Sequence, residues 1–328
     1  MADRTPSPEK AAGGKPHIKW GDAYSKGRTA VESLSTILRY FPPRLSSSET
    51  PAMDLLQDPD IATQISALLR RPDSGAVNDN LCAWLYDTFH SSEPQLQLVV
   101  LRFLPIIAGV YLTRAALNKP LPGFESVLLA IYAHETAARN GQAVTVSIPD
   151  LSHASIYHES KMPTKNASTE LHLAVITASL EPHGTVRSTR RAKIVGVALE
   201  LYYSKISQFP VGSKLDFCDF CKIWSGQNSH DNHEKSTEAR RGRINLAWEL
   251  LQPIMRILGH CLFRPEKSDE LFQAAFVACR CLNSRAQHDT NAKAMLATGS
   301  LVKLAEMAKN PASNVDYTEI AMSNEISV

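Results

Sequence analysis

The fold is indicated most clearly by the stretch Phe124-Glu-Ser-Val-Leu-Leu-Ala-Ile-Tyr132. Its large apolar residues recur at intervals of three and four positions: Phe124, Val127, Leu128, Ile131 and Tyr132. On an α-helix this spacing forms one apolar stripe, which must pack against another element. Asn140-Gly141 then marks a helix end, because glycine readily adopts the left-handed backbone found there. The stretch predicts a helix over residues 124–139 with one buried face.

The same period continues over most of the chain on both sides of this helix. The expected helices span residues 30–39, 61–69, 78–90, 94–117, 188–208, 237–262, 266–283 and 291–309. Kinks are expected at Pro105 and Pro253, because proline disturbs the interior of a helix. No fixed repeat period connects these segments. The sequence therefore predicts a mainly α protein, either an irregular helical bundle or an α-solenoid-like body.

Two short segments have a different period. Residues 143–148 alternate Val144, Val146 and Ile148 with polar residues, and residues 171–180 also favour β structure. We expect them to form one small antiparallel β pair. An isolated pair is only marginally stable in water, so it is expected to lie on the helical body.

The ends of the chain differ in composition from its middle. Residues 1–27 are charged and contain Pro and Gly, and residues 310–328 hold three acids without Lys or Arg. Both are predicted to be disordered tails around one helical domain at 28–309. A polar insertion loop is expected at 225–236.

Composition limits the class of protein. The chain has 328 residues and a net charge of +2, so the whole molecule is not built to attract nucleic acid or a membrane surface. Six scattered cysteines fit reduced thiols in a cytosolic protein, and the N-terminus has no signal-peptide pattern. The apolar stretch 96–112 contains Arg102 and Pro105 and is shorter than the roughly 20 residues of a membrane span. It is predicted to be a buried helix.

One pattern resembles a metal site. Cys218-Asp-Phe-Cys221 is followed by His230 and His233, in the spacing C-x2-C-x8-H-x2-H. These residue types bind zinc, which would make the chain a zinc-containing helical interaction module. Both the histidine spacing and the separation of the two pairs are shorter than is usual. The favoured interpretation is a half-buried cysteine pair with solvated histidines, and no metal or cofactor.

Catalytic signatures are absent from the sequence. It contains neither of the glycine-rich phosphate-binding motifs, and no G-x-S-x-G, H-E-x-x-H or kinase H-R-D motif. The sequence therefore favours a protein that is not an enzyme.

Two basic clusters lie near expected helix starts. Cations there oppose the helix dipole and cost roughly 0.3–1 kcal/mol each. They either form a solvated face or contact acidic side chains of a partner or anionic lipid. The clusters are Arg187, Arg190, Arg191 and Lys193, and Arg240, Arg241 and Arg243.

Several segments resemble the hyccin family. The characteristic motif is matched by Ser147-Ile-Pro-Asp-Leu-Ser152 and Ala154-Ser-Ile-Tyr-His-Glu159. The stretches 91–105 and 123–132 resemble the helices that precede this motif, and the similarity runs in order from about Leu81 to Tyr203. The length, the Ser- and Pro-rich linker at 42–51 and the Cys218–His233 stretch are similar to plant-type hyccins. Animal members carry a longer C-terminal tail.

The resemblance implies a non-catalytic subunit of the type III alpha phosphatidylinositol 4-kinase complex. In that family hyccin packs against a tetratricopeptide-repeat scaffold, and a lipid-anchored membrane protein recruits the assembly. The resemblance thus implies a cytoplasmic protein, recruited peripherally to the plasma membrane, that supports phosphatidylinositol 4-phosphate synthesis without binding nucleic acid. Its motif residues would either pin the inter-strand connection to the core or contact a partner: Ser155, Ile156, Tyr157, His158 and Glu159.

Overall fold

The computed structural model describes residues 19–117, 119, 121–137, 144–149, 171–176, 188–226, 246–264 and 268–309. This part of the chain is mainly helical, which confirms the predicted class. The helices of its N-terminal half are α1 (Lys19–Ser35), α2 (Pro43–Ser46), α3 (Pro51–Gln57), α4 (Pro59–Leu69), α5 (Asn80–His90), α6 (Pro94–Arg102), α7 (Leu104–Ala116) and α8 (Pro122–Ala137). The later helices are α9 (Ser188–Ser204), the 3-10 turn η2 (Ile206–Gln208), α10 (Val211–Trp224), α12 (Trp248–Phe263), α13 (Asp269–His288) and α14 (Ala292–Lys309).

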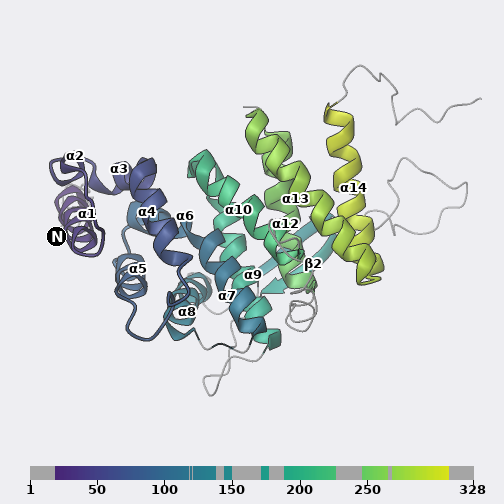
Figure 1. Cartoon of the computed structure of the whole chain (residues 1–328), viewed down its shortest axis with the longest axis horizontal. Coiled ribbons are helices and arrows are strands. Elements are labelled where there is room, and N and C mark those ends of the chain that lie inside the picture. The colour runs from purple at the N-terminus through teal and green to yellow at the C-terminus, as the bar shows by residue number, and fades with distance from the viewer. Residues whose placement is uncertain are drawn as a thin grey trace, which may run out of the picture.

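Helices that are near in sequence also pack together in space. α1 contacts α3, α5 contacts α8, α9 contacts α12, and α13 contacts α14. Figure 1 shows the resulting progression from the purple α1–α3 end to the yellow α14 end. One hydrophobic core runs through the described chain from Val31 to Ala305. The arrangement is therefore an irregular, solenoid-like stack of helices around a continuous core.

The structure contains two β-strands, β1 (Val144–Pro149) and β2 (Leu171–Ile176). They pair in antiparallel register, with Val144 opposite Ile176 and Pro149 opposite Leu171. The connection between the two strands lies outside the described residues. The strands occupy the segments in which the period of the sequence changes.

Helix starts follow directly from the sequence. Proline occupies the first turn of α2, α3, α4, α6 and α7, where its missing N–H would have no helical partner. Asp58 caps α4, because its Oδ1 accepts hydrogen bonds from the backbone N–H groups of Asp60 and Ile61, at 2.9 and 3.0 Å. Asp79 caps α5 in the same way. These caps satisfy amides that the helix itself leaves free.

Asp58 predicts a pH-dependent part of the stability. Burial acts to raise the pKa of this carboxyl, but the N–H of Ile61 and the guanidinium of Arg44, 2.5 Å away, lower it overall. A lowered folded-state pKa stabilises the fold above the unfolded pKa of about 3.9, and this contribution is lost as the pH falls through the folded value. Asp58→Ala is expected to reduce the free energy of unfolding at pH 7 by about 1–2 kcal/mol.

Urea titrations at pH 7 and at pH 3 check this expectation. Asp58→Asn retains an acceptor for the cap and removes the charge, so its loss at pH 7 should be smaller than that of the alanine variant. Equal losses for the alanine variant at both pH values would contradict a role for the ionised carboxylate.

The predicted N-terminal tail at 1–27 is too long, because α1 begins at Lys19. The first half of α1 is held by contacts that hydrophobic periodicity does not show. Gly27 is buried, and a Cβ there would lie 3.0 Å from Cγ of Pro51. Lys26 Nζ donates to the backbone oxygen of Ser91 at 3.0 Å. Residues 1–18 and the predicted tail at 310–328 lie outside the described residues.

The single helix predicted over residues 94–117 is wrong. α6 ends at Arg102 and α7 starts at Leu104, with a bend of 47° at Phe103. Pro105 lies in the first turn of α7 rather than at a kink inside one helix, because its ring would clash with the carbonyl of a continuing helix. No single helix in the described chain is long and apolar enough to span a membrane. The bent pair α6–α7 reaches the required length and apolar composition only when its two helices are taken together. Most of its side chains are buried in the core.

The helix predicted over residues 237–262 begins later, at Trp248. Ala247 precedes it in an extended conformation, with φ −64° and ψ 135°, so the helix cannot reach back through this residue. Pro253 lies inside α12, as the sequence predicts. Of the insertion loop predicted at 225–236, only Ser225 and Gly226 are described; they end α10, with Gly226 at φ 86°.

Candidate interaction site

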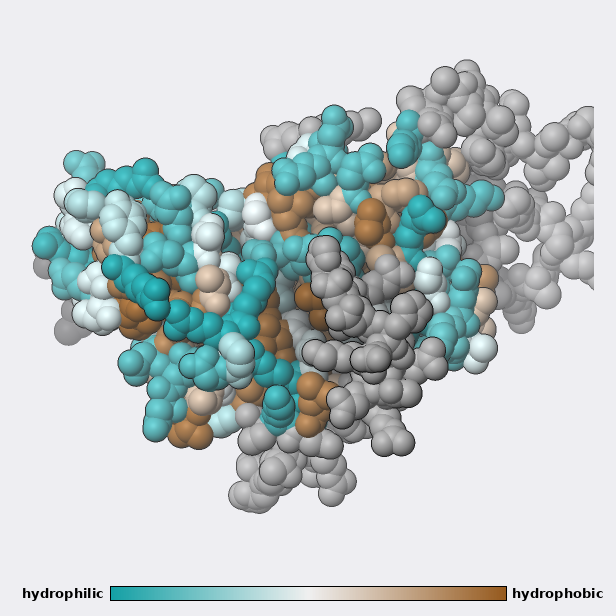
Figure 2. Space-filling view, viewed as in Figure 1, coloured by the Kyte–Doolittle hydropathy of each residue, from teal (hydrophilic) through white to brown (hydrophobic). Residues whose placement is uncertain are grey.

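A groove lies between α7 and α10, near the middle of the helical stack. It encloses a hollow of about 360 Å³. Figure 2 shows brown, hydrophobic surface at the centre of the view, where Figure 1 places these two helices. α7 contributes one face of residues to it: Pro105, Ile106, Gly109, Val110 and Thr113. α10 contributes another: Asp216, Asp219, Phe220, Lys222 and Ile223. We call this surface the α7–α10 groove.

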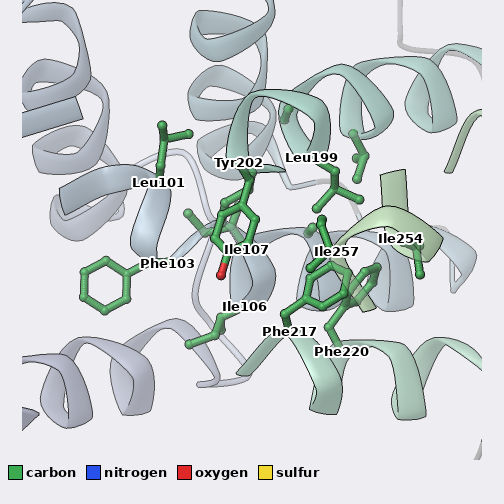
Figure 3. Packing of buried hydrophobic residues seen from close by; sticks show 14 of the residues in the cluster. Leu101, Phe103, Ile106, Ile107, Leu199, Tyr202, Phe217, Phe220, Ile254 and Ile257 are labelled. Atoms are coloured by element: carbon green, nitrogen blue, oxygen red, sulfur yellow. The ribbon is translucent and has the colours of Figure 1, made fainter. Parts of the chain in front are cut away.

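Glycine allows the two helices of the groove to approach closely. A Cβ on Gly109 would lie 3.1 Å from Cδ2 of Phe220. Two helical turns before Phe220, Ser213 Oγ donates to the backbone oxygen of Arg102 at 2.7 Å. The same Oγ lies 2.9 Å from the hydroxyl of Tyr202. Figure 3 shows Phe217 and Phe220 packed near Ile257, with Tyr202 and Ile107 beside them. The groove therefore rests on the central part of the core.

Charged side chains form the rim of the groove. Arg70 Nη2 lies 2.6 Å from Asp216 Oδ1, and Lys222 Nζ lies 2.5 Å from Asp219 Oδ1. Burial raises the pKa of Asp216 even though the Arg70 guanidinium opposes this shift. The rim thus carries two ion pairs around an apolar floor.

Arg114 completes the rim next to Thr113. Its Nη1 donates to the backbone oxygen of Ser74 at 2.6 Å, and its Nη2 donates to the backbone oxygen of Arg71. Desolvation by burial lowers its pKa, and the charge of Asp73 opposes this shift. Within the described ranges, no carboxylate forms an ion pair with Arg114. The guanidinium therefore binds carbonyl groups while its charge is not neutralised by direct contact.

The two cysteines of the predicted metal site lie in the core. Cys218 and Cys221 on α10 are fully buried, beside Cys261 of α12 and Cys279 of α13. The pKa of Cys218 is raised by its hydrogen bond to the Cys261 thiol and by burial; burial is the main cause of the raised pKa of Cys221. A raised pKa disfavours the thiolate that binds metal.

The histidines of the same pattern, His230 and His233, lie outside the described residues. Among the residues that are described, no group of three or more His, Cys, Asp or Glu side chains could hold a metal ion. The cysteine pair packs more deeply than the half-buried position predicted from sequence.

The basic residues at the start of α9 lie in different environments. Arg187 precedes the described part of α9, and Arg190 lies in its first turn without a described side chain. Arg191 is half-buried near Tyr111, whose hydroxyl donates to Glu125 Oε1 at 2.9 Å. Burial raises the pKa of Tyr111, with Glu125 adding to this effect and Arg191 opposing it. Arg191 thus lies where α9 meets α7 and α8.

Of the remaining predicted site residues, only Lys193 is described, and it is half-buried on α9. The family-motif residues and the second basic cluster lie outside the described residues: Ser155, Ile156, Tyr157, His158, Glu159, Arg240, Arg241 and Arg243.

The family model described as Hyccin matches residues 46–327 of the 328-residue chain. This chain belongs to the hyccin family. The hyccin family is a non-catalytic regulatory family, so a regulatory-subunit role fits the helical body and its core. Both helices of the α7–α10 groove lie within the hyccin match, whereas α1 precedes it.

Proposed function

We propose that this chain is a regulatory subunit that stabilises a type III alpha phosphatidylinositol 4-kinase complex and helps to recruit it to the plasma membrane. The observation that carries the proposal is the hyccin match over residues 46–327. In this proposal the chain is cytoplasmic and binds a tetratricopeptide-repeat scaffold together with the kinase. A lipid-anchored protein holds the assembly peripherally at the membrane, where it makes phosphatidylinositol 4-phosphate.

Exposed apolar surface supports a role in assembly. Large apolar side chains are exposed on the last two helices, at Val277 of α13 and at Leu296 and Leu304 of α14. Partner subunits commonly cover such surface on helical stacks. The motif at 155–159 and the basic clusters are further contacts in this proposal, with a protein partner or with anionic lipid.

The internal contacts of Arg191 limit how the first basic cluster can be tested. Because Arg191 is half-buried near Tyr111, its removal would disturb the packing of α7, α8 and α9. A variant that neutralises only Arg187 and Arg190 tests partner or lipid contact more cleanly.

Reconstitution tests the proposed function. The purified chain, incubated with phosphatidylinositol and ATP, is expected to form no phosphatidylinositol 4-phosphate. Added to kinase and scaffold, it should increase the yield of intact complex or its lipid kinase activity, with kinase and scaffold alone as the control. Turnover by the isolated chain, or an unchanged complex after its addition, would contradict the proposal.

A further inference from the structure

We propose that the α7–α10 groove is the docking site for one amphipathic helix of a partner in this complex. The docked helix would place apolar side chains at positions i, i+3 or i+4, and i+7 against the floor, with a carboxylate next to Arg114. The inference rests on the proposed function, because it takes the partner from the same assembly. It adds the location of the contact and the chemistry of the segment that binds there.

The shape and apolar character of the groove fit a helix. Ile106 and Phe220 form a buried floor, Val110 is half-buried, and Ile223 is 44% exposed at the edge. The α7 residues from 105 to 113 extend over about 12 Å, at a rise of 1.5 Å per residue. This length matches two turns of a docked helix, whose side chains would pack between two rows that also repeat every three or four residues.

The charge of the groove decides which helix fits. Among the residues that line the groove, Arg70, Arg114 and Lys222 face two acids, Asp216 and Asp219, and each of these acids is already within 2.6 Å of a cation. Asp73, outside the lining, acts on Arg114 through its charge but forms no ion pair with it among the described residues. The remaining positive charge belongs to Arg114, which bonds to carbonyl groups in a partly desolvated position. A partner carboxylate there would form a charge-assisted contact, which is stronger in such surroundings than in water. An acidic residue at one end of the docked helix is therefore favoured over a basic one.

A second copy of this chain and a lipid acyl chain are the competing occupants. An acyl chain has no negative charge that could pair with the Arg114 guanidinium. A second copy would give a dimer that depends on the same residues. Binding and crosslinking measurements distinguish both from a partner helix.

The experiment measures binding of the purified full chain to the purified scaffold and to the scaffold–kinase complex. Ile223→Asp places a carboxylate on the apolar edge and is expected to weaken binding at least tenfold, or about 1.4 kcal/mol. Leu129→Asp is the matched control, because Leu129 is 37% exposed on α8 and lies outside the groove. It should bind within about twofold of the wild type. Circular dichroism melting checks that both variants fold.

Arg114→Gln provides a second, independent variant. The amide keeps hydrogen-bond donors on a shorter side chain and removes the charge. Binding should weaken, and its dependence on salt should become shallower, because screening no longer acts on this contact. A photo-crosslinking residue at position 223 should attach to a helical segment of the scaffold or kinase that contains an acidic residue.

The outcomes separate the two proposals. Failure of the wild-type chain to bind either partner overturns the proposed function. Normal wild-type binding with no effect of Ile223→Asp, or crosslinks to a non-helical segment, overturns only the docking site. A wild-type dimer that Ile223→Asp dissociates, with unchanged scaffold binding, assigns the groove to a second copy. Vesicle binding by the isolated chain that Ile223→Asp abolishes assigns it to lipid, and both results overturn the partner helix.

Discussion

Gly196→Ala is expected to lower the free energy of unfolding by about 1–3 kcal/mol. Gly196 lies on α9 where this helix packs against α12, and a Cβ there would lie 2.6 Å from the backbone oxygen of Glu249. A backbone atom cannot rotate away as a side chain can, so the two helices must separate. Their facing residues are buried on both sides, including Val195 and Leu250, so a small separation disturbs the core.

Gly259→Ala is the matched control for this prediction. Gly259 lies inside α12, and a Cβ there would meet nothing within 4 Å. Alanine is a better helix former than glycine by roughly 1 kcal/mol, so this variant should be slightly more stable than the wild type. Urea unfolding of both variants gives the comparison. The close-packing argument fails if the two substitutions change the stability in the same direction.

Sequence alone was sufficient for the helices whose burial is periodic. The stripe from Phe124 to Tyr132 lies in α8, and Pro94 begins α6 as its position predicts. The first half of α1 was missed because it is held through Gly27 and the Nζ of Lys26, which carry no apolar signal. The break at Phe103 was missed because Pro105 marks a disturbance without showing on which side the helix restarts.

The candidate site could not be predicted in the same way. The apolar sequence of α7 does not show which face of this helix stays exposed. That depends on α10, which packs on part of α7 but lies about a hundred residues later in the chain. Cys218 and Cys221 have a ligand-like spacing, but the burial that disfavours their thiolates depends on α12 and α13. Arg191 belongs to a basic cluster in sequence, yet it lies half-buried near Tyr111, where α9 meets α7 and α8. In each of these three cases, a contact with a residue distant in sequence determines what the side chain or surface does.

Arg102 carries the second large expected effect. The side chain is only 6% exposed, and its Nη1 donates to the backbone oxygens of Leu56 and Asp58, the latter at 3.3 Å. These oxygens lie where α3 passes into α4. Burial lowers the pKa of Arg102, and the charges of Asp216 and Asp58 oppose this shift. A buried guanidinium therefore connects the α3–α4 junction to the end of α6.

Arg102→Met is expected to lower the free energy of unfolding by about 2–4 kcal/mol, because methionine keeps apolar volume but leaves two buried carbonyls without this donor. Arg102→Lys should reduce the free energy of unfolding by less, since an ammonium can still donate to one of the two carbonyls. Arg28→Met is the surface control: Arg28 forms an exposed i,i+4 pair with Glu32, and exposed pairs contribute little, so no measurable change is expected. Chemical denaturation of the three variants should give this order. Equal stability of Arg102→Met and the wild type would show that the buried guanidinium is not needed to hold the α3–α4 junction.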